Sequence, residues 1–536
     1  MKRGLGTLCL SMVLSVVMIL TGILQKAMAL SLDQAREETM ATSIQMSPNP
    51  AYGSEWTVFA LLRNEAALPE GYLSGYLTCL EQTLQETDGI LHSRKYTEYA
   101  RVVLALTAAG VNPWDVGGYN LVGPLGDRDA VLRQGVNGAI FALLALDAGN
   151  YPVPAAPSGS AQATRGEYVR AILEAQTKDG GFALSGDVAD ADVTAMALTA
   201  LAPYQGRLPG VSQGVQAGIA CLSRLQGEDG CYASEGSSNC ESTAQVVVAL
   251  CTLGISLDDP RFVKHGVDLQ EALGSFQVAD GGFSHHKGEA ASQMATEQAL
   301  YALAALWRAE HGKTSMYDMA DVKGFSKKQQ GLPGKEEAVM PRAITAAGKT
   351  FPDIASHPAR TAIETLAAYG VLNGKSDTVF DPNATMTRAE FAATAVRALG
   401  LSPQRISLFT DVEAGSWYDA YVGTAYSFGI TKGTSSRTFT PNGTITREEA
   451  AVMVARAARL CGIETELTLE QQREILSLYE DGSSVSDWAR ASVAFCCKLG
   501  WMPGEELALL PQTPVLRSEV AEMFAYLLLE GDLLIS

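Results

Sequence analysis

The sequence lacks the features that define several large classes of protein. It has 40 Lys and Arg against 59 Asp and Glu, a net charge of −19, and phosphate binding needs a basic face, so nucleic acid is not an expected partner. Its nine cysteines are too sparse in 536 residues to form a disulfide framework, although Cys231 with Cys240 is the most plausible local bridge. After residue 29 no apolar run approaches the ~20 residues that a membrane span needs.

The N-terminus has the one long apolar run of the chain. Lys2 and Arg3 precede apolar residues from Leu5 to about Leu24, and Ala27-Met28-Ala29 forms an A-x-A cleavage pattern. This arrangement predicts a secretory signal peptide over residues 1–29, with an uncleaved membrane anchor as the alternative. We therefore expect an exported protein with no membrane span after signal cleavage.

A short motif recurs in the first half of the mature chain. QTKDGGF begins at Gln176, QGEDGCY at Gln226 and QVADGGF at Gln277. Between the copies lie stretches such as DVTAMALTAL and ESTAQVVVAL, which are apolar on nearly all sides and alternate with more amphipathic segments. Helices buried on both faces have this composition, so the repeat predicts hairpins of an inner and an outer helix.

The repeated motif resembles the Q-x-x-x-G-x-W/F repeat of the terpenoid cyclase and protein prenyltransferase toroids. The matching structural residues are Gln176, Phe182, Gln226, Tyr232, Gln277 and Phe283. The resemblance implies an all-α fold, an α/α toroid of the six-hairpin type over residues 50–310, in which the glutamine ties off helix ends and the aromatic ring packs between repeats. An open solenoid is the alternative arrangement of such repeats.

Asp190 and Asp192 are the candidate catalytic residues of this region. Asp190-Ala191-Asp192-Val193-Thr194-Ala195 resembles the Asp-x-Asp-Asp-Thr-Ala acid motif of squalene cyclases, but Val193 replaces the last aspartate. The alternative role is capping at the start of an inner helix. The chain lacks a complete prenyltransferase zinc motif and the thioester motif, so we expect no metal and no cofactor, and the toroid is interpreted as more consistent with binding than with catalysis.

A different repeat follows a linker at residues 311–349. Units such as FTDVEAGSWYDAYVGTAYSFGITKG…FTPNGTITREEA resemble S-layer homology modules. The resemblance predicts three helical modules, at residues 350–406, 407–465 and 476–536. It implies binding to an anionic, pyruvylated secondary cell-wall polysaccharide.

The Thr-Arg-x-Glu segment of each module suits that ligand. Threonine and glutamate can form a capping box at the start of a helix, where a guanidinium can bind a carboxylate through two parallel hydrogen bonds. Alternatively, each arginine pairs with a carboxylate of its own module. Pro358 and Leu516 depart from the family pattern, so we expect the best groove to hold Arg447 with Trp417. The candidate polysaccharide-binding residues are Asp353, Arg388, Asp411, Trp417, Arg447, Trp488 and Arg517.

Together these features predict a secreted protein on the wall or S-layer surface of a Gram-positive-type bacterium. The modules would anchor it non-covalently to the wall polysaccharide, and the toroid would bind a ligand or partner that the sequence does not identify. The alternative is an extracellular carbohydrate-active lyase or hydrolase in the toroid. A terpenoid cyclase-like enzyme ranks below it, since that lipid substrate is made inside the cell.

Overall fold

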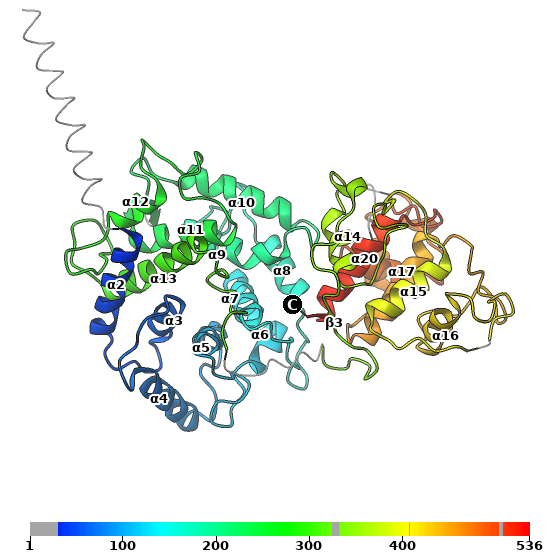
Figure 1. Ribbon diagram of the computed structural model, residues 1–536, viewed down its shortest axis with the longest axis horizontal. Coiled ribbons are helices and arrows are strands. Elements are labelled where there is room, and N and C mark those ends of the chain that lie inside the picture. Colours follow the sequence, from blue (N-terminus) through cyan, green and yellow to red (C-terminus); the bar gives the residue numbers. More distant parts are fainter. Residues whose placement is uncertain (1–30, 235, 324–331, 407, 503–507, 536) are drawn as a thin grey trace, which may run out of the picture. The chain divides into compact units, whose positions relative to one another are not determined.

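The computed structural model describes residues 31–234, 236–323, 332–406, 408–502 and 508–535 (Figure 1). The predicted signal peptide, residues 1–29, lies outside the described residues. The chain divides into two compact units, and each is described by itself. Of the described residues, the first contains those up to 83 with 190–199 and 221–319, and the second contains those of 84–189, 200–220 and 320–535.

The first unit is built around two helices that are apolar on nearly all sides. They are α11 (Cys240–Thr252) and α13 (Gln293–Glu310), which pack against each other, and α13 also packs against α2 (Leu32–Met46) and α3 (Glu55–Arg63). The Asn239 side chain caps α11 by accepting from the backbone N–H of Ser242 at 2.8 Å. Ser292 caps α13 in the same way. The shorter α12 (Leu269–Gly274) packs against α11.

The second unit is also built around an apolar helix that packs against its neighbours. Helix α7 (Gly135–Ala148) packs between α5 (Thr97–Ala108) and α8 (Arg165–Glu174), and the short α6 (Arg128–Leu132) precedes it. Thr164 and Glu167 form a capping box at the start of α8. Three helices pass from one unit to the other: α4 (Tyr72–Glu86), α9 (Ala191–Leu201) and α10 (Val211–Leu225).

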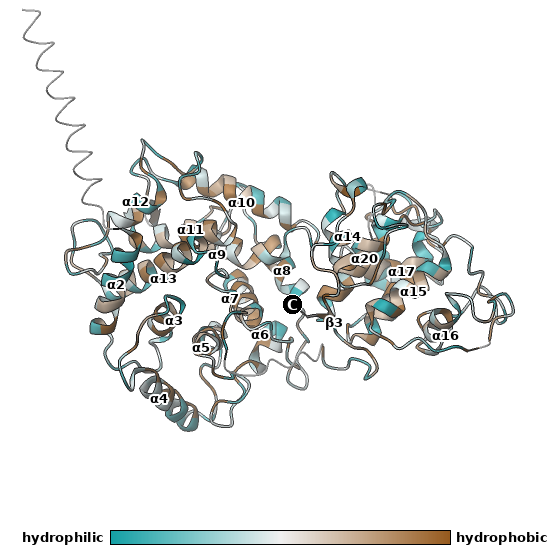
Figure 2. Ribbon diagram, in the orientation of Figure 1, coloured by the Kyte–Doolittle hydropathy of each residue, from teal (hydrophilic) through white to brown (hydrophobic). Residues whose placement is uncertain are grey.

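Strands are few and short. An antiparallel hairpin joins β1 (Tyr232–Ser234) to β2 (Ser237–Asn239), with Tyr232 opposite Asn239, and β3 (Arg342–Ala343) pairs in parallel with β4 (Leu534–Ile535). Most helices carry both hydrophobic and hydrophilic residues (Figure 2). The predicted all-α class is confirmed, because the described elements are nearly all helices. Among the described residues no helix has the length and apolar character to cross a membrane.

Two of the repeated glutamines connect their own turn to a segment that lies 36–38 residues later in the chain. In the second unit, Gln176 Nε2 donates to the carbonyl oxygens of Gly180 and Gly214, both at 2.8 Å. In the first unit, Gln226 Nε2 donates to the carbonyls of Gly230 at 2.9 Å and Phe262 at 2.8 Å. Gln277 departs from this pattern, because its buried Nε2 has no partner among the described residues. The aromatic rings of the three motifs are fully buried: Phe182, Tyr232 and Phe283.

Replacing Gln226 with leucine is expected to lower the free energy of unfolding by about 2–6 kcal/mol, because two buried carbonyls lose their donor and each such loss costs roughly 1–3 kcal/mol. Urea denaturation followed by circular dichroism measures the change. Gln216→Leu, an exposed position in α10, is the matched control and should change the midpoint little. Equal midpoints for the two variants would contradict a structural role for the glutamine.

The predicted bridge between Cys231 and Cys240 was wrong. All cysteines of the described residues are free thiols. Both of these are buried and point to different neighbours, the Cys231 Sγ lying 3.7 Å from the Ala272 carbonyl and the Cys240 Sγ 3.7 Å from the Ala295 carbonyl. Each thiol therefore fills space in the core of the first unit.

Seven helices in the second unit form the C-terminal modules. Modules one and two contain α14 (Arg360–Ala368) with α15 (Arg388–Ala398), and α16 (Asp419–Ser427) with α17 (Arg447–Leu460). The third contains α19 (Arg490–Lys498) with α20 (Arg517–Glu530), preceded by α18 (Leu469–Leu476). Helix α15 packs on α16, α17 on α19, and α20 on α14. The second helix of each module thus contacts the first helix of the next, and the cycle closes from the third module to the first.

Candidate functional sites

The Thr-Arg-x-Glu segments begin α15 and α17 as capping boxes. Thr387 Oγ1 accepts from the backbone N–H of Glu390 at 3.2 Å, and Glu390 Oε2 accepts from the N–H of Thr387 at 2.8 Å. Thr446 and Glu449 repeat both bonds. In the third module, Leu516 cannot accept, and only its N–H donates to Glu519. The segment therefore fixes where each second helix starts.

Each arginine reaches into the next module rather than pairing within its own. Arg388 donates through Nε to the Phe439 carbonyl at 2.9 Å and through Nη1 to Glu449 Oε1 at 2.7 Å. Arg447 makes the same contacts with the Leu509 carbonyl and Glu519. Arg517 closes the cycle by donating to the Phe380 carbonyl of the first module at 3.0 Å. All three arginines are at most 6% exposed.

The aspartates of the modules hold the loops that receive these arginines. Asp353 accepts from the N–H groups of Phe380 and Asp381, and Asp411 accepts from those of Phe439 and Thr440. Asp481 repeats the contact in the third module. Asp381, Thr440 and Leu510 all have positive φ, which is an uncommon backbone conformation for such residues. The aspartates therefore stabilise the strained turn against which the guanidinium of the preceding module rests.

The structure does not bring Arg447 together with Trp417, as the sequence had predicted for one groove. Arg447 contacts the third module, whose exposed tryptophan is Trp488, whereas Arg388 contacts the second module, which contains Trp417. Both indole rings are largely exposed, 56% for Trp417 and 60% for Trp488. The sequence analysis did not predict that each arginine contacts the following module. The repeated glutamate of the motif was its only signal.

Two of the arginines keep unused capacity for an anion. The Arg447 Nη2 atom is buried and has no hydrogen-bond partner among the described residues. Arg517 donates to the carbonyls of Phe380 and Asn373 without a carboxylate within ion-pair distance in the described part of the chain. Burial lowers the pKa of Arg517, while Glu390, Asp381 and Asp353 oppose this from farther away. An anionic ligand would satisfy both groups.

In the first unit, the structure separates the roles of Asp190 and Asp192. Asp190 Oδ1 accepts from the backbone N–H of Val193 at 3.0 Å, so it caps α9. Asp192 does not cap, and its Oδ1 atom is buried with no partner among the described residues. The pKa of Asp192 is raised to about 6, chiefly by burial; the Ser242 side chain lowers it, and the charges of Asp190 and Glu241 add to the rise.

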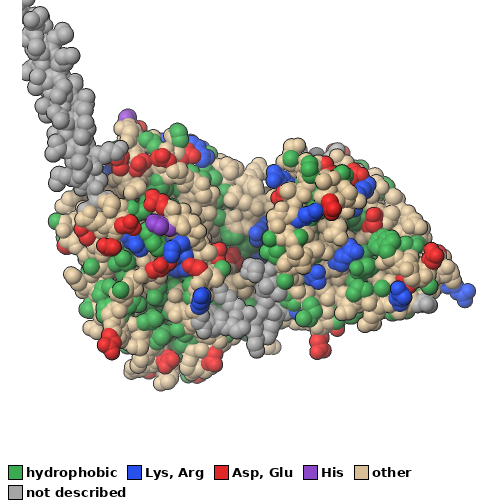
Figure 3. Space-filling view, viewed as in Figure 1, with side chains coloured by type: hydrophobic (Ala, Val, Ile, Leu, Met, Phe, Trp, Pro, Cys, Tyr) green, Lys and Arg blue, Asp and Glu red, His purple; other side chains and the backbone are tan. Residues whose placement is uncertain are grey.

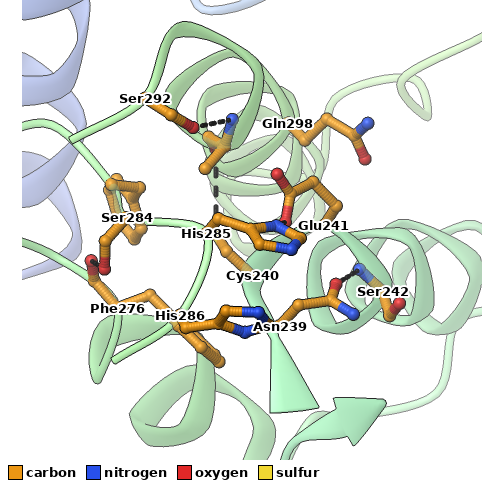
Figure 4. A network of polar contacts seen from close by, with 12 residues as sticks. Asn239, Cys240, Glu241, Ser242, Phe276, Ser284, His285, His286, Ser292 and Gln298 are labelled. Atoms are coloured by element: carbon orange, nitrogen blue, oxygen red, sulfur yellow. Dashed lines mark hydrogen bonds and ion pairs between the residues drawn. The ribbon is translucent and has the colours of Figure 1, made fainter. Parts of the chain in front are cut away.

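Glu241 occupies the same helical position as Asp192, two residues after a capping residue. Its Oε2 atom accepts from His285 Nδ1 at 2.7 Å, in the loop before α13 (Figure 4). Its Oε1 atom is buried without a partner in the described residues, and the whole residue is only 7% exposed. The His285 side chain is 46% exposed, so solvent reaches the pair from the histidine side. Glu241 was not among the candidate residues predicted from the sequence.

Polar and aromatic side chains of neighbouring inner helices continue this cluster. Gln245 of α11 bonds Tyr301 and Gln298 of α13, and the Tyr301 hydroxyl donates to Gln298 Oε1 at 3.1 Å. The Tyr301 pKa lies well above its usual value, chiefly because of burial, with Asp192 among the charges that raise it. The half-buried Trp56 of α3 lies beside Tyr301, with ring centroids 6.5 Å apart.

Acidic and basic side chains are interspersed over the visible face (Figure 3). No set of three or more His, Cys, Asp and Glu side chains within the described ranges is arranged to hold a metal ion.

The cyclic arrangement of capped helices, buried arginines and turn-holding aspartates defines a tandem helical-module protein. The module is the S-layer homology domain, whose family model matches residues 350–392 and 408–451. Those matches fall in the first two modules. The third module has the same aspartate and backbone contacts, with Leu516 in place of threonine.

Curated relatives share a part of the chain. Amylopullulanase of Thermoanaerobacterium thermosulfurigenes is 38% identical over 183 residues, 34% of this chain and 10% of its own length. Exoglucanase XynX of Acetivibrio thermocellus is 35% identical over 176 residues, 32% of this chain and 15% of its own. The surface-layer 125 kDa protein of Lysinibacillus sphaericus is 31% identical over 192 residues, which are 35% of this chain and 15% of its own length. The chain therefore spans only a small fraction of the length of these relatives.

Among solved structures, the unsaturated glucuronyl hydrolase of Bacillus sp. GL1 aligns with 55% of this chain and 100% of its own, at a TM-score of 0.34 and 14% identity. It is a glucuronyl hydrolase and not a terpenoid cyclase. The predicted S-layer homology modules are confirmed for residues 350–392 and 408–451, and a surface-layer protein is among the relatives that share part of this chain.

Proposed function

We propose that the protein is secreted by means of the signal peptide at residues 1–29 and is held on the wall of a Gram-positive-type bacterium. Its toroid, residues 50–310, would be joined by the linker at 311–349 to modules at 350–406, 407–465 and 476–536. The modules bind an anionic, pyruvylated secondary wall polysaccharide without a covalent bond, and the toroid binds a ligand or partner. The three glutamine motifs support the finer kinship with terpenoid cyclase and prenyltransferase toroids.

The buried, unpartnered Nη2 of Arg447 carries the anchoring proposal. A pyruvyl carboxylate would supply its missing acceptor through a charge-assisted hydrogen bond. Trp488 belongs to the module that Arg447 contacts, and its exposed ring offers a flat face for a sugar. Arg388 with Trp417 and Asp411, and Arg517 with Asp353, are the proposed equivalents in the other two grooves. Weak grooves in tandem hold firmly, because once one binds, the others act at high effective concentration.

Replacing Trp488 with alanine is expected to weaken binding to the isolated polysaccharide about tenfold, as truncation of a central interface tryptophan commonly costs at least ~1 kcal/mol. Isothermal titration of the full chain with polysaccharide released from cell walls measures this. Leu478→Ala, an equally exposed apolar residue, is the control and should not change the affinity. Equal affinities of wild type and both variants would contradict a ligand role for the indole.

A second candidate function is an extracellular carbohydrate-active enzyme in the toroid. The observation that favours it is a second buried carboxylate, Glu241, close enough to raise the pKa of Asp192. Two carboxyl groups in different protonation states are the usual requirement for glycoside cleavage. Terpenoid cyclisation ranks below it, because its substrate is made inside the cell.

A further inference from the structure

We propose that the N-terminal ends of α9 and α11 form an acid–base site for hydrolysis of an O-glycosidic bond, with Asp192 as the proton donor and Glu241, oriented by His285, as the base that activates water. The assignment rests on the second candidate function, a carbohydrate-active toroid. It names the residues that would carry out the reaction.

Two unpartnered oxygens carry the inference. Asp192 Oδ1 and Glu241 Oε1 are both buried and have no hydrogen-bond partner among the described residues. A buried acceptor without a partner is costly, and native structures rarely retain one unless a ligand or function uses it. Here two occur on neighbouring carboxyl groups at equivalent positions of successive inner helices. Glu241 is more than nine-tenths buried, so solvent does not explain its unused oxygen.

Capping does not account for either oxygen. Asp190 and Asn239 already accept from the first free N–H groups of their helices, which leaves Asp192 and Glu241 without that role. The partial positive charge of a helix N-terminus would favour the ionised form of a carboxyl group. Burial overcomes this at Asp192, whose pKa rises to about 6, so it can hold a proton in mildly acidic surroundings.

The histidine gives the two carboxyl groups different roles. His285 Nδ1 lies 2.7 Å from Glu241 Oε2, so an imidazole N–H can donate to that oxygen, while Oε1 has no partner among the described residues and can accept from a water. Asp192 has no cationic partner of this kind, and the charges of Asp190 and Glu241 favour its protonated form. One carboxyl group is thus prepared to give a proton and the other to accept one.

The same neighbourhood indicates the substrate class. Trp56 presents a half-buried ring beside Tyr301, and the amides of Gln245 and Gln298 supply donors and acceptors of the kind that sugar hydroxyls need. Cleavage of a glycosidic acetal requires a proton donor and a carboxylate. It does not require an activated serine or cysteine nucleophile. These groups together fit an oligosaccharide or polysaccharide.

The reaction balances with water as the only co-reactant. Asp192 transfers its proton to the glycosidic oxygen as the bond from that oxygen to the anomeric carbon breaks. A water oxygen forms the new bond to the anomeric carbon, and Glu241 Oε1 takes a proton from that water. The products are an alcohol and a hemiacetal. Proton exchange with solvent then restores protonated Asp192 and ionised Glu241.

The expected rate falls as the pH rises through about 6, because Asp192 then loses its proton. Besides burial, three neighbouring groups set the pKa of Asp192: Asp190 and Glu241 raise it, and the Ser242 side chain lowers it. Tyr301, beside Asp192, stays protonated throughout this range because its own pKa is raised.

The test uses the full chain with two kinds of substrate: 4-nitrophenyl glycosides of neutral, N-acetylated and acidic sugars, and polysaccharide released from cell walls. We expect wild type to release nitrophenol or new reducing ends. Asp192→Asn and Glu241→Gln should each lower the rate by about 10²- to 10⁴-fold, the usual contribution of general acid–base catalysis. Asp258→Asn, at an exposed aspartate of the same unit, should retain the wild-type rate.

Circular dichroism and sedimentation with cell walls, recorded for each variant, separate loss of chemistry from loss of fold or anchoring. A rate that Asp192→Asn leaves unchanged would overturn the assignment while leaving the enzyme function standing. Absence of release from every substrate by wild type would overturn both the assignment and the enzyme function. Sedimentation with walls in that case would leave the anchoring proposal intact.

Discussion

Replacing Arg165 with methionine is expected to lower the free energy of unfolding of the second unit by about 3–5 kcal/mol, the usual cost of breaking a buried ion pair from one side. The Arg165 guanidinium is 6% exposed. Its Nε atom contacts Asp147 Oδ1 at 2.9 Å, and its Nη1 atom contacts Asp532. Methionine would fill the space and leave both carboxylates without a cation.

The surrounding contacts explain why this loss cannot be absorbed locally. Asp532 also accepts from the backbone N–H of Val153 at 2.8 Å, and Asp147 accepts from the Tyr204 hydroxyl at 2.7 Å. Next to them, Glu530 is 2% exposed and pairs with Arg170 at 3.1 Å. A carboxylate freed by the substitution is therefore held in place away from water, where an unpaired charge is expensive.

Urea denaturation of the full chain, followed by circular dichroism, measures this effect. Arg261→Met is the matched control, because Arg261 makes comparable bonds to Asp259 at 2.8–2.9 Å but its side chain is 47% exposed. Exposed pairs contribute only ~0–1 kcal/mol. Similar midpoints for the two variants would show that the buried network does not stabilise the fold.

Replacing Arg447 with lysine is expected to weaken binding of the full chain to isolated wall polysaccharide by about 10- to 100-fold, because hydrogen bonds to charged groups contribute roughly 1.5–3 kcal/mol. Lysine keeps the positive charge beside Glu519 but lacks the planar fork that offers the unpartnered Nη2 to a ligand. Since the cation is retained, the fold should be less affected than by a neutral substitution.

Isothermal titration with polysaccharide released from walls measures the loss, and thermal unfolding shows whether the module remains folded. Arg437→Lys is the control in the same module, at an exposed loop position. Unchanged affinity in Arg447→Lys would mean that the second nitrogen has no ligand. An equal loss in Arg437→Lys would indicate a general effect of charge distribution instead.

Local signals in the sequence predicted the architecture well. The three glutamine motifs and the apolar helices predicted an α/α toroid, and Thr-Arg-x-Glu predicted both the modules and the capping boxes at Thr387 and Thr446. These features depend on residues three to six positions apart, which the chain brings together whatever the rest of the fold does.

Contacts between residues far apart in the chain were not predictable in the same way. Nothing near Arg388 in sequence indicates that it meets Glu449, 61 residues later, because that depends on how one module packs on the next. The role of Glu241 was missed for the same reason, since His285 is 44 residues away. The Cys231–Cys240 bridge failed because nearness in sequence does not place two thiols face to face.

Sedimentation of the full chain with purified Gram-positive cell walls, before and after removal of the secondary polysaccharide, tests the central claim most directly. The account predicts that intact walls retain the protein, that stripped walls do not, and that added free polysaccharide releases it. Equal retention on stripped walls would contradict anchoring through the modules to this polysaccharide.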